Sequence, residues 1–154
     1  MTPLLTVDVD IDRPRAQVLA WWTGFPDEYA AADPKEQPHR IKVVHRSAQT
    51  LEVLTWWRSG VGVDLVIPET FRFRDNGDFD VDVTLPLGLR QLDRFAFEDR
   101  GTRTHLRVEI LLGPRSAVGL LTRPLFAAYA RSAYPRTFRH AGRLCEKAAP
   151  RAGG

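Results

Sequence analysis

The sequence has few of the residues that support redox or metal chemistry. Its single cysteine, Cys145, excludes an internal disulfide, a redox pair and a zinc knuckle. The four histidines, His39, His45, His105 and His140, are scattered along the chain. His140 and Cys145 are five positions apart, so they do not share one face of a helix as a zinc pair would. We therefore expect no metal and no cofactor.

Several catalytic and binding signatures are also missing. The sequence contains no nucleophile elbow, no phosphate-binding GxxxxGK[ST] loop and no GxGxxG after a predicted strand. Basic residues are not interleaved with aromatic residues on a sheet face, so no nucleic-acid partner is expected. The start, MTPLLTVDVDIDRP, has neither a basic segment nor a long apolar run. It predicts no signal peptide or membrane anchor and favours a cytoplasmic location.

The composition is that of a globular domain. Hydrophobic residues make up 44% of the 154 residues, charged residues 27% and aromatic residues 10%, which is ample for a packed interior. A chain of this length buries about two-thirds of the surface that its unfolded form exposes. We predict one domain over residues 1–148 and a flexible tail over residues 149–154.

Charge is distributed unevenly around a net value of +3. After residue 114 Glu146 is the only acidic residue, and the basic residues there are Arg115, Arg123, Arg131, Arg136, Arg139, Arg143, Lys147 and Arg151. Such a segment can meet an anionic surface, or it can be the solvated face of a helix.

Hydrophobic periodicity predicts mostly strands. Residues 5–11 alternate apolar and polar side chains, which is typical of a strand with one face in water. Asp12 and Pro14 then favour a helix over PRAQVLAWWTGF, and PDEYAAAD predicts a second short helix. Alternation returns at residues 41–43, 51–57, 63–73, 79–85, 87–97 and 106–112, so we expect about seven strands.

The last part of the chain changes to a helical period. Tyr134, Phe138, Ala141, Cys145 and Ala148 form an apolar stripe. The opposite side carries the basic stripe, defined as Arg136, Arg139, Arg143 and Lys147, which could make weak contact with an anionic membrane surface. Thr122 and Pro124 predict the start of this helix, and Pro135 should kink it. One helix cannot cover a flat sheet of seven strands, so the sheet should curl around it and enclose a space.

The segments VDVDIDRPRAQVLAWWTGFPDEY and FRHAGRLCEKAA, with the run of strands between them, resemble the START-like, or Bet v 1-like, superfamily (SRPBCC). This superfamily includes the polyketide cyclase/dehydrase and lipid-transport types, and the resemblance covers nearly the whole chain. It implies an α+β helix-grip fold, in which a curved antiparallel sheet of about seven strands wraps around a long C-terminal helix and leaves a cavity. It implies no particular reaction, because the superfamily contains carriers, sensors and enzymes.

Glu69 is the candidate that would give such a cavity chemical character. It shares the parity of an apolar stripe formed by Val63, Leu65, Ile67, Phe71 and Phe73. An inward carboxyl group there would lose solvent and have a raised pKa, so Glu69 is a candidate acid, base or ligand-orienting group. Alternatively, Pro68 introduces a bulge and turns Glu69 toward a loop or an arginine.

Other inward polar or aromatic positions extend this candidate site. Gln91 and Asp93 share the parity of Phe95, unless a bulge or strand break near Pro86 and Gly88 shifts the register. Trp57 is favoured over Trp56 for the inner face, and the two tyrosines of the last helix either face the cavity or belong to the core. The expected ligand-binding residues are Trp57, Glu69, Phe71, Val83, Gln91, Asp93, Phe95, Tyr129 and Tyr134.

These features favour a carrier or sensor for a small, mostly apolar molecule such as a lipid, an isoprenoid quinone or a polyketide-like compound. One alternative is a cyclase or dehydratase type of enzyme that uses Glu69, and Asp93 or a tyrosine, as acid and base in the same cavity. A second alternative is an interaction module that binds a partner through its basic helix. A purely apolar cavity would indicate carriage, and clustered ionisable groups would indicate chemistry.

Overall fold

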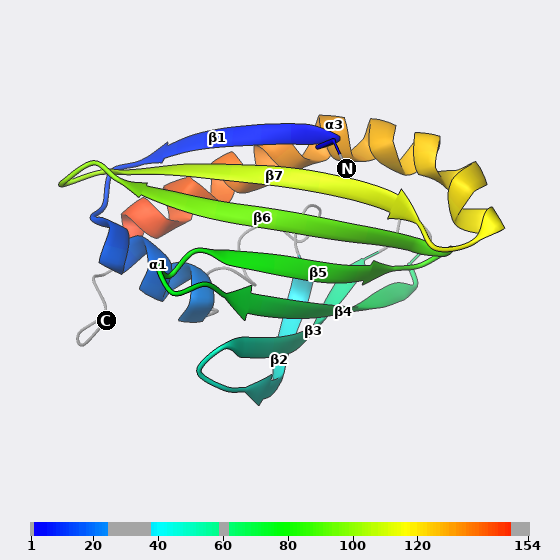
Figure 1. Ribbon diagram of the computed structural model, residues 1–154, viewed down its shortest axis with the longest axis horizontal. Coiled ribbons are helices and arrows are strands. Elements are labelled where there is room, and N and C mark those ends of the chain that lie inside the picture. Colours follow the sequence, from blue (N-terminus) through cyan, green and yellow to red (C-terminus); the bar gives the residue numbers. More distant parts are fainter. Residues whose placement is uncertain (1, 25–37, 59–61, 149–154) are drawn as a thin grey trace.

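The computed structural model describes residues 2–24, 38–58 and 62–148 of the chain (Figure 1). Its elements are β1 (Leu5–Ile11), α1 (Arg15–Gly24), β2 (Pro38–Arg46), β3 (Thr50–Arg58), β4 (Asp64–Phe73), β5 (Phe79–Leu85), β6 (Leu89–Asp99), β7 (Thr104–Pro114) and α3 (Ala117–Lys147). The second short helix predicted over residues 26–33 and the tail over residues 149–154 lie outside the described residues.

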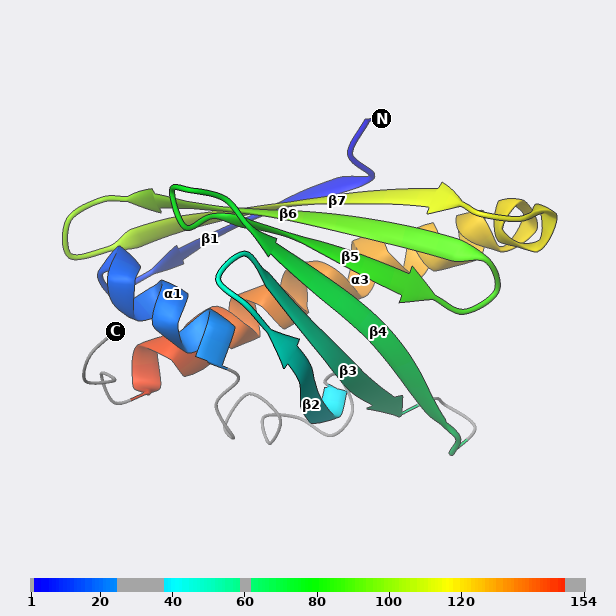
Figure 2. The same cartoon turned by 60° about the horizontal axis from the view of Figure 1, so that its bottom comes forward.

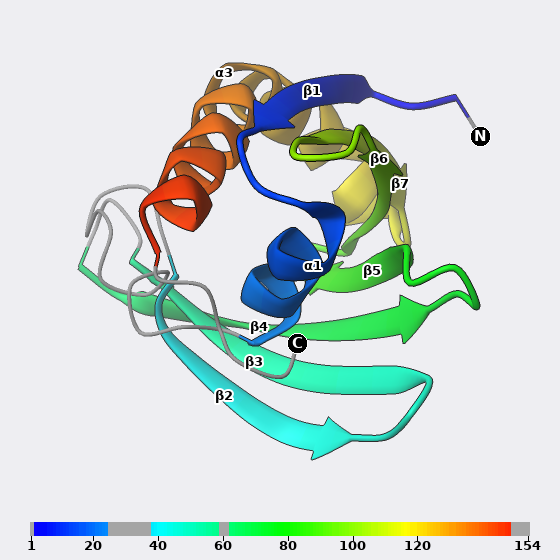
Figure 3. The ribbon, with the colours of Figure 1, turned by 90° about the vertical axis from the view of Figure 1, so that its left-hand side faces the viewer.

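The strands form one antiparallel sheet in the order β1-β7-β6-β5-β4-β3-β2. Figure 3 shows that this sheet curves and holds both α1 and α3 on its concave side. The helix α3 packs mainly against β1 and β7, at one end of the strand order. The α+β helix-grip architecture predicted from the sequence is therefore confirmed.

Alternation along the strands decides which side chains face inward. In β7 the residues Leu106, Val108, Ile110 and Leu112 are buried, as their period of two predicts. The inward side chains of β5 and β6 add Phe79 and Phe95, whose stacked rings have centroids 4.7 Å apart. This aromatic packing forms the centre of the hydrophobic core.

The outer face of the sheet is charged. Asp82 accepts hydrogen bonds from Arg90 and Arg72, which together hold the pKa of that carboxyl group below its usual range. His105 bonds Asp8 at 2.9 Å and Asp10 at 2.8 Å on the same face. Exposed pairs of this kind contribute little stability.

The helix α3 begins earlier than the sequence predicts. Its N-cap is Ser116, whose Oγ accepts a hydrogen bond from the Gly119 amide at 3.1 Å. The expected cap is wrong, because Thr122 lies inside the helix and donates to the Val118 carbonyl at 3.0 Å. Pro124 also lies inside the helix, and Figure 2 shows the first turns of α3 running in a different direction from the rest.

The start of α3 is packed tightly against the turn between β5 and β6. The Gly88 carbonyl accepts a hydrogen bond from the Arg115 amide at 2.6 Å. A Cβ atom at Gly119 would lie 2.0 Å from the same carbonyl oxygen, so only glycine fits there. This contact holds the first turns of α3 beside the β5–β6 turn.

No helix in the described ranges has both the length and the apolar character that crossing a bilayer requires.

Gly119→Ala should lower the free energy of unfolding by about 1–3 kcal/mol, because the backbone of the β5–β6 turn cannot move aside easily. Gly142→Ala in the same helix is the matched control. Its Cβ would meet the Val9 side chain at 2.9 Å, which can adjust, so a smaller loss is expected. Urea unfolding of both variants measures the difference, and equal losses would contradict this account of the Gly119 contact.

Candidate ligand-binding site

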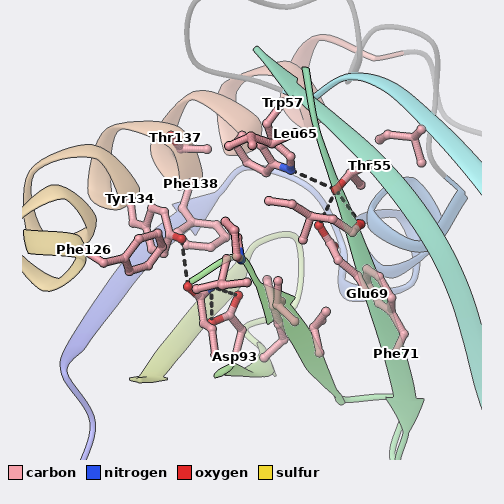
Figure 4. Close-up of a pocket in the computed structure, with 18 of the residues that line it drawn as sticks. Thr55, Trp57, Leu65, Glu69, Phe71, Asp93, Phe126, Tyr134, Thr137 and Phe138 are labelled. Carbon is pink, nitrogen blue, oxygen red and sulfur yellow. Dashed lines mark hydrogen bonds between the residues drawn. The ribbon is translucent and has the colours of Figure 1, made fainter. Parts of the chain in front are cut away.

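A cavity of about 340 Å³ lies between the inner face of the sheet and α3 (Figure 4). This volume is within the range of small-molecule sites. Its wall is mostly apolar and includes Trp22, Ile41, Leu65, Ile67, Val81, Leu85, Pro86, Phe126 and Phe138. All nine expected ligand-binding residues also border it: Trp57, Glu69, Phe71, Val83, Gln91, Asp93, Phe95, Tyr129 and Tyr134.

The register of the strands determines the direction of Glu69, the first polar side chain of this wall. Glu69 pairs with Val53 of β3 and with Val83 of β5, so its side chain faces inward with theirs. The pairing of β3 with β4 continues through Pro68 without a shift, and the proposed bulge is therefore wrong. Pairing of β4 with β5 stops at Glu69, so the missing amide hydrogen of Pro68 breaks no bond to β5.

Glu69 belongs to a hydrogen-bonded group with Thr55 and Trp57. Trp57 Nε1 donates to Thr55 Oγ1 at 2.9 Å, and that hydroxyl oxygen lies 3.2 Å from the Ile67 carbonyl oxygen and 2.8 Å from Glu69 Oε1. Thr55 has one hydroxyl hydrogen for two acceptors. Thr55 can donate to the Ile67 carbonyl or to Glu69, and the contact with Glu69 Oε1 is the shorter of the two.

Burial raises the pKa of Glu69 to about 7, although the hydrogen bond with Thr55 opposes the rise. Part of the side chain is exposed, and that part borders the cavity. No Lys, Arg or His side chain is among the described residues that line the cavity. The alternative of an arginine partner for Glu69 therefore has no support in the described wall, and a carboxyl group in this setting favours its neutral form.

Asp93 forms the second polar group, together with Gln91 and Tyr134. Gln91 Nε2 donates to both carboxyl oxygens of Asp93 at 2.9 Å, and Tyr134 donates its hydroxyl hydrogen to Gln91 Oε1 at 2.8 Å. Burial raises the pKa of Asp93 to about 8, and the charge of Glu69 adds to the rise. Burial also raises the pKa of the Tyr134 phenol, which stays neutral. Figure 4 shows the two polar groups facing the cavity from different sides.

The strand break considered near Pro86 and Gly88 is present as the turn between β5 and β6, but Gln91 still faces inward. The strand β6 that follows this turn is unbroken. It pairs continuously with β5 and β7 from Leu89 onward. The irregular residues lie in the preceding turn, where Leu87 has a φ of 60° and Gly88 a φ of 71°. Leu87 is consequently exposed and does not share the inward parity of Gln91.

Trp57 lies beside the cavity, as the sequence predicted, and the two tyrosines differ from each other in exposure. Trp57 borders the cavity, whereas the Trp56 ring carries the Arg40 guanidinium 4.6 Å from its centroid. Tyr134 is largely covered, but Tyr129 is 53% exposed at the edge of the cavity. Sequence reasoning missed Thr55, although it shares the parity of Val53 and Trp57 on β3 and parity alone could have indicated it.

The described residues contain no cluster of three or more His, Cys, Asp or Glu side chains that could hold a metal ion. Cys145 is buried, and burial raises the pKa of its thiol to about 12, so it is a poor nucleophile near neutral pH. The chemistry available in the cavity is therefore that of Glu69, Asp93, Tyr134 and their amide and hydroxyl partners.

Comparison with solved structures identifies the fold. The Zhui aromatase/cyclase from Streptomyces sp. R1128 matches with a TM-score of 0.75 at 12% identity, covering 97% of each chain. TTHA0849 from Thermus thermophilus matches with a TM-score of 0.71 at 14% identity, over 94% of this chain and 98% of the other. Ara h 8.0201 matches with a TM-score of 0.63 at 12% identity, over 94% and 97% of the two chains. The fold is the START-like, or Bet v 1-like, helix-grip fold.

Because all three identities are low, these comparisons establish the START-like fold and nothing more. No protein-family model and no curated protein matches the sequence. Neighbours with this fold include aromatase/cyclases as well as Ara h 8.0201, so the fold alone does not choose between ligand carriage and cyclase chemistry. The choice between these functions therefore depends on the side chains that line the cavity.

Glu69→Gln should change the pH dependence of stability. Glu69 has its ordinary pKa of 4.5 in the unfolded chain and about 7 in the fold, so the folded state keeps a proton that the unfolded state releases. The wild type therefore loses stability as pH rises from 4.5 to 7, by an amount on the order of 3 kcal/mol, and the loss is constant above that range. The variant lacks this contribution from Glu69, while both proteins keep the contribution of Asp93, whose pKa is raised to about 8.

The measurement is the difference in unfolding free energy between Glu69→Gln and the wild type at several pH values. Glu52→Gln is the matched control, because Glu52 is exposed on the neighbouring strand β3. A difference that grows in favour of Glu69→Gln with rising pH supports a desolvated Glu69. A variant that is markedly less stable than the wild type at pH 7 would instead show an ionised, paired carboxylate.

Proposed function

We propose that the protein binds a small, mostly apolar molecule that carries oxygen atoms, and acts as its carrier or sensor. The observation that supports this most strongly is an apolar cavity with no basic residue in its described wall and two carboxyl groups that favour the neutral form. Such a wall excludes anionic ligands, because a charged group would be desolvated without a partner. A lipid, an isoprenoid quinone or a polyketide-like compound fits this chemistry.

The hydrogen bonds within the cavity determine which donors and acceptors remain for the oxygen atoms of a ligand. Both Asp93 oxygens accept from Gln91, so a protonated Asp93 has one hydroxyl hydrogen left for a ligand carbonyl. Tyr134 uses its hydrogen on Gln91, and its oxygen can still accept from a ligand hydroxyl. A ligand with a carbonyl and a hydroxyl group near one another would satisfy both positions. The predicted site residues Phe71, Val83 and Phe95 would pack against its apolar part.

Val83→Trp should weaken the binding of a neutral, environment-sensitive dye such as Nile red by about tenfold, because the larger ring occupies cavity space. Thr84→Trp is the matched control, since Thr84 is the next residue of β5 and is exposed on the outer face. Fluorescence titration gives both affinities, and thermal unfolding shows whether each variant is folded. Equal dye affinities in the two folded variants would contradict a binding cavity over Val83.

A second candidate function is acid–base catalysis of the cyclase or dehydratase type, and one observation favours it. Glu69 and Asp93 have pKa values of about 7 and 8, so near neutral pH one can be ionised while the other is protonated. The carboxylate would take a proton from the carbon beside a ligand carbonyl. The carboxylic acid would give its proton to a β-hydroxyl group, which leaves as water.

If the cavity catalyses this dehydration, Glu69→Gln and Asp93→Asn should each lower kcat by at least about 100-fold while dye affinity changes little. The assay is water loss from a β-hydroxy ketone that carries an aromatic ring, followed by mass spectrometry. Thr84→Ala, on the outer face, should keep full activity. Dye binding without turnover in the wild type would leave carriage or sensing as the function.

A further inference from the structure

The residues that line the cavity are not equally covered, and the exposed ones mark where it opens. Leu65, Pro86 and Tyr129 are exposed while they border the cavity. They come from the start of β4, the β5–β6 turn and the first half of α3. Figure 2 shows these three segments at the same end of the molecule. We refer to Leu65, Pro86 and Tyr129 as the cavity entrance.

Exposed apolar side chains surround the cavity entrance. On α3, Val118, Leu121, Leu125 and Tyr129 follow steps of three, four and four, so they lie on one face of the helix. Their exposed fractions are 52%, 78%, 78% and 53%. Amphipathic helices of globular proteins normally turn such a stripe toward the core. Here the stripe faces outward and ends at the cavity entrance.

One further exposed residue extends this surface on the sheet side. Leu87 follows Pro86 in the β5–β6 turn and is 62% exposed. The entrance surface is therefore Leu87, Val118, Leu121 and Leu125. Isolated apolar residues on a surface are ordinary, but a group on two segments beside one opening is typical of an interaction site.

The charge near this surface indicates the kind of partner. Between Glu109 and Glu146 the chain has no acidic residue, and Arg115 and Arg131 are exposed near the two ends of the apolar stripe. Asp64, beside Leu65, is an acidic exception at this end. A second copy that presented the same surface would bring like charges together. Projecting leucines with positive charge behind them are instead suited to the interface of an anionic membrane.

We propose that the entrance surface inserts into an anionic phospholipid membrane, so that an apolar ligand passes between the bilayer and the cavity without crossing water. This inference rests on the proposed carrier function, and it gives that carrier a partner and a direction of approach. The side chains that enter the bilayer are those of Leu121 and Leu125. The basic residues of α3 add a long-range attraction that salt weakens.

The test is sedimentation with mixed phosphatidylcholine and phosphatidylglycerol vesicles. The double variant Leu121→Ser/Leu125→Ser should bind about tenfold more weakly than the wild type, because two apolar side chains no longer enter the bilayer. Val44→Ser is the matched control, since Val44 is 56% exposed on β2, away from the entrance, and should bind as the wild type does. Nile red binding in solution should be unchanged in both, since none of the substituted residues lines the cavity.

A second measurement tests which residues of α3 contact the bilayer. The variant Leu121→Trp should be quenched by brominated phosphatidylcholine in anionic vesicles more strongly than the wild-type tryptophans are. The basic stripe, Arg136, Arg139, Arg143 and Lys147, is also exposed, so its reversal to Glu tests the other surface of α3. Loss of binding in that variant with normal binding of Leu121→Ser/Leu125→Ser would overturn the proposal.

Two other outcomes would also overturn it. One is an absence of vesicle binding by a wild type that still binds Nile red, and this result would leave the proposed ligand cavity intact. The other is a change of oligomeric state without lipid in Leu121→Ser/Leu125→Ser, which would assign the entrance surface to a contact between copies. Loss of Nile red binding to the wild type in solution would count against the cavity function itself.

Discussion

The structure depends on a mismatch in packing between one helix and a sheet that is wider than the helix. The helix α3 packs mainly against β1 and β7, while β3, β4 and β5 curve away from it (Figure 3). Inward side chains of the distant strands therefore face a space that neither α1 nor α3, the helices of the described residues, fills. Such a space is unusual, because protein interiors are closely packed and leave few voids. The cavity is thus a consequence of the helix-grip arrangement.

Carboxyl groups on the two faces of the sheet have pKa values that are shifted in opposite directions. On the outer face, Arg90 bonds Asp82 and lowers the pKa of its carboxyl group. On the inner face, burial raises the pKa of Asp93 and Glu69 toward neutrality. Position in the alternation of a strand therefore decides whether a carboxyl group is paired with arginine on the outer face or desolvated beside the cavity. The pocket is mostly apolar yet has clustered ionisable groups, so it is compatible with carriage and with chemistry.

Sequence periodicity predicted the strands, the closing helix and the inward positions of Glu69 and Asp93, because a period of two fixes the face of a side chain once a strand is in register. The N-cap was placed wrongly at Thr122. Its hydroxyl and a following proline make a plausible cap in sequence, whereas Ser116 is selected by the contact of the helix start with Gly88. The bond from Tyr134 to Gln91 joins residues 43 positions apart, and only the tertiary structure reveals it.

The central claim is that burial beside the cavity raises the pKa of both Glu69 and Asp93 far above the usual range of a carboxyl group. Their carboxyl carbons can be followed directly by carbon-13 NMR during a pH titration, with Glu69→Gln and Asp93→Asn used to assign the signals. The account predicts midpoints near 7 for Glu69 and near 8 for Asp93, and further upward shifts when a neutral apolar ligand fills the cavity. Midpoints close to 4 for both carboxyl groups would contradict it.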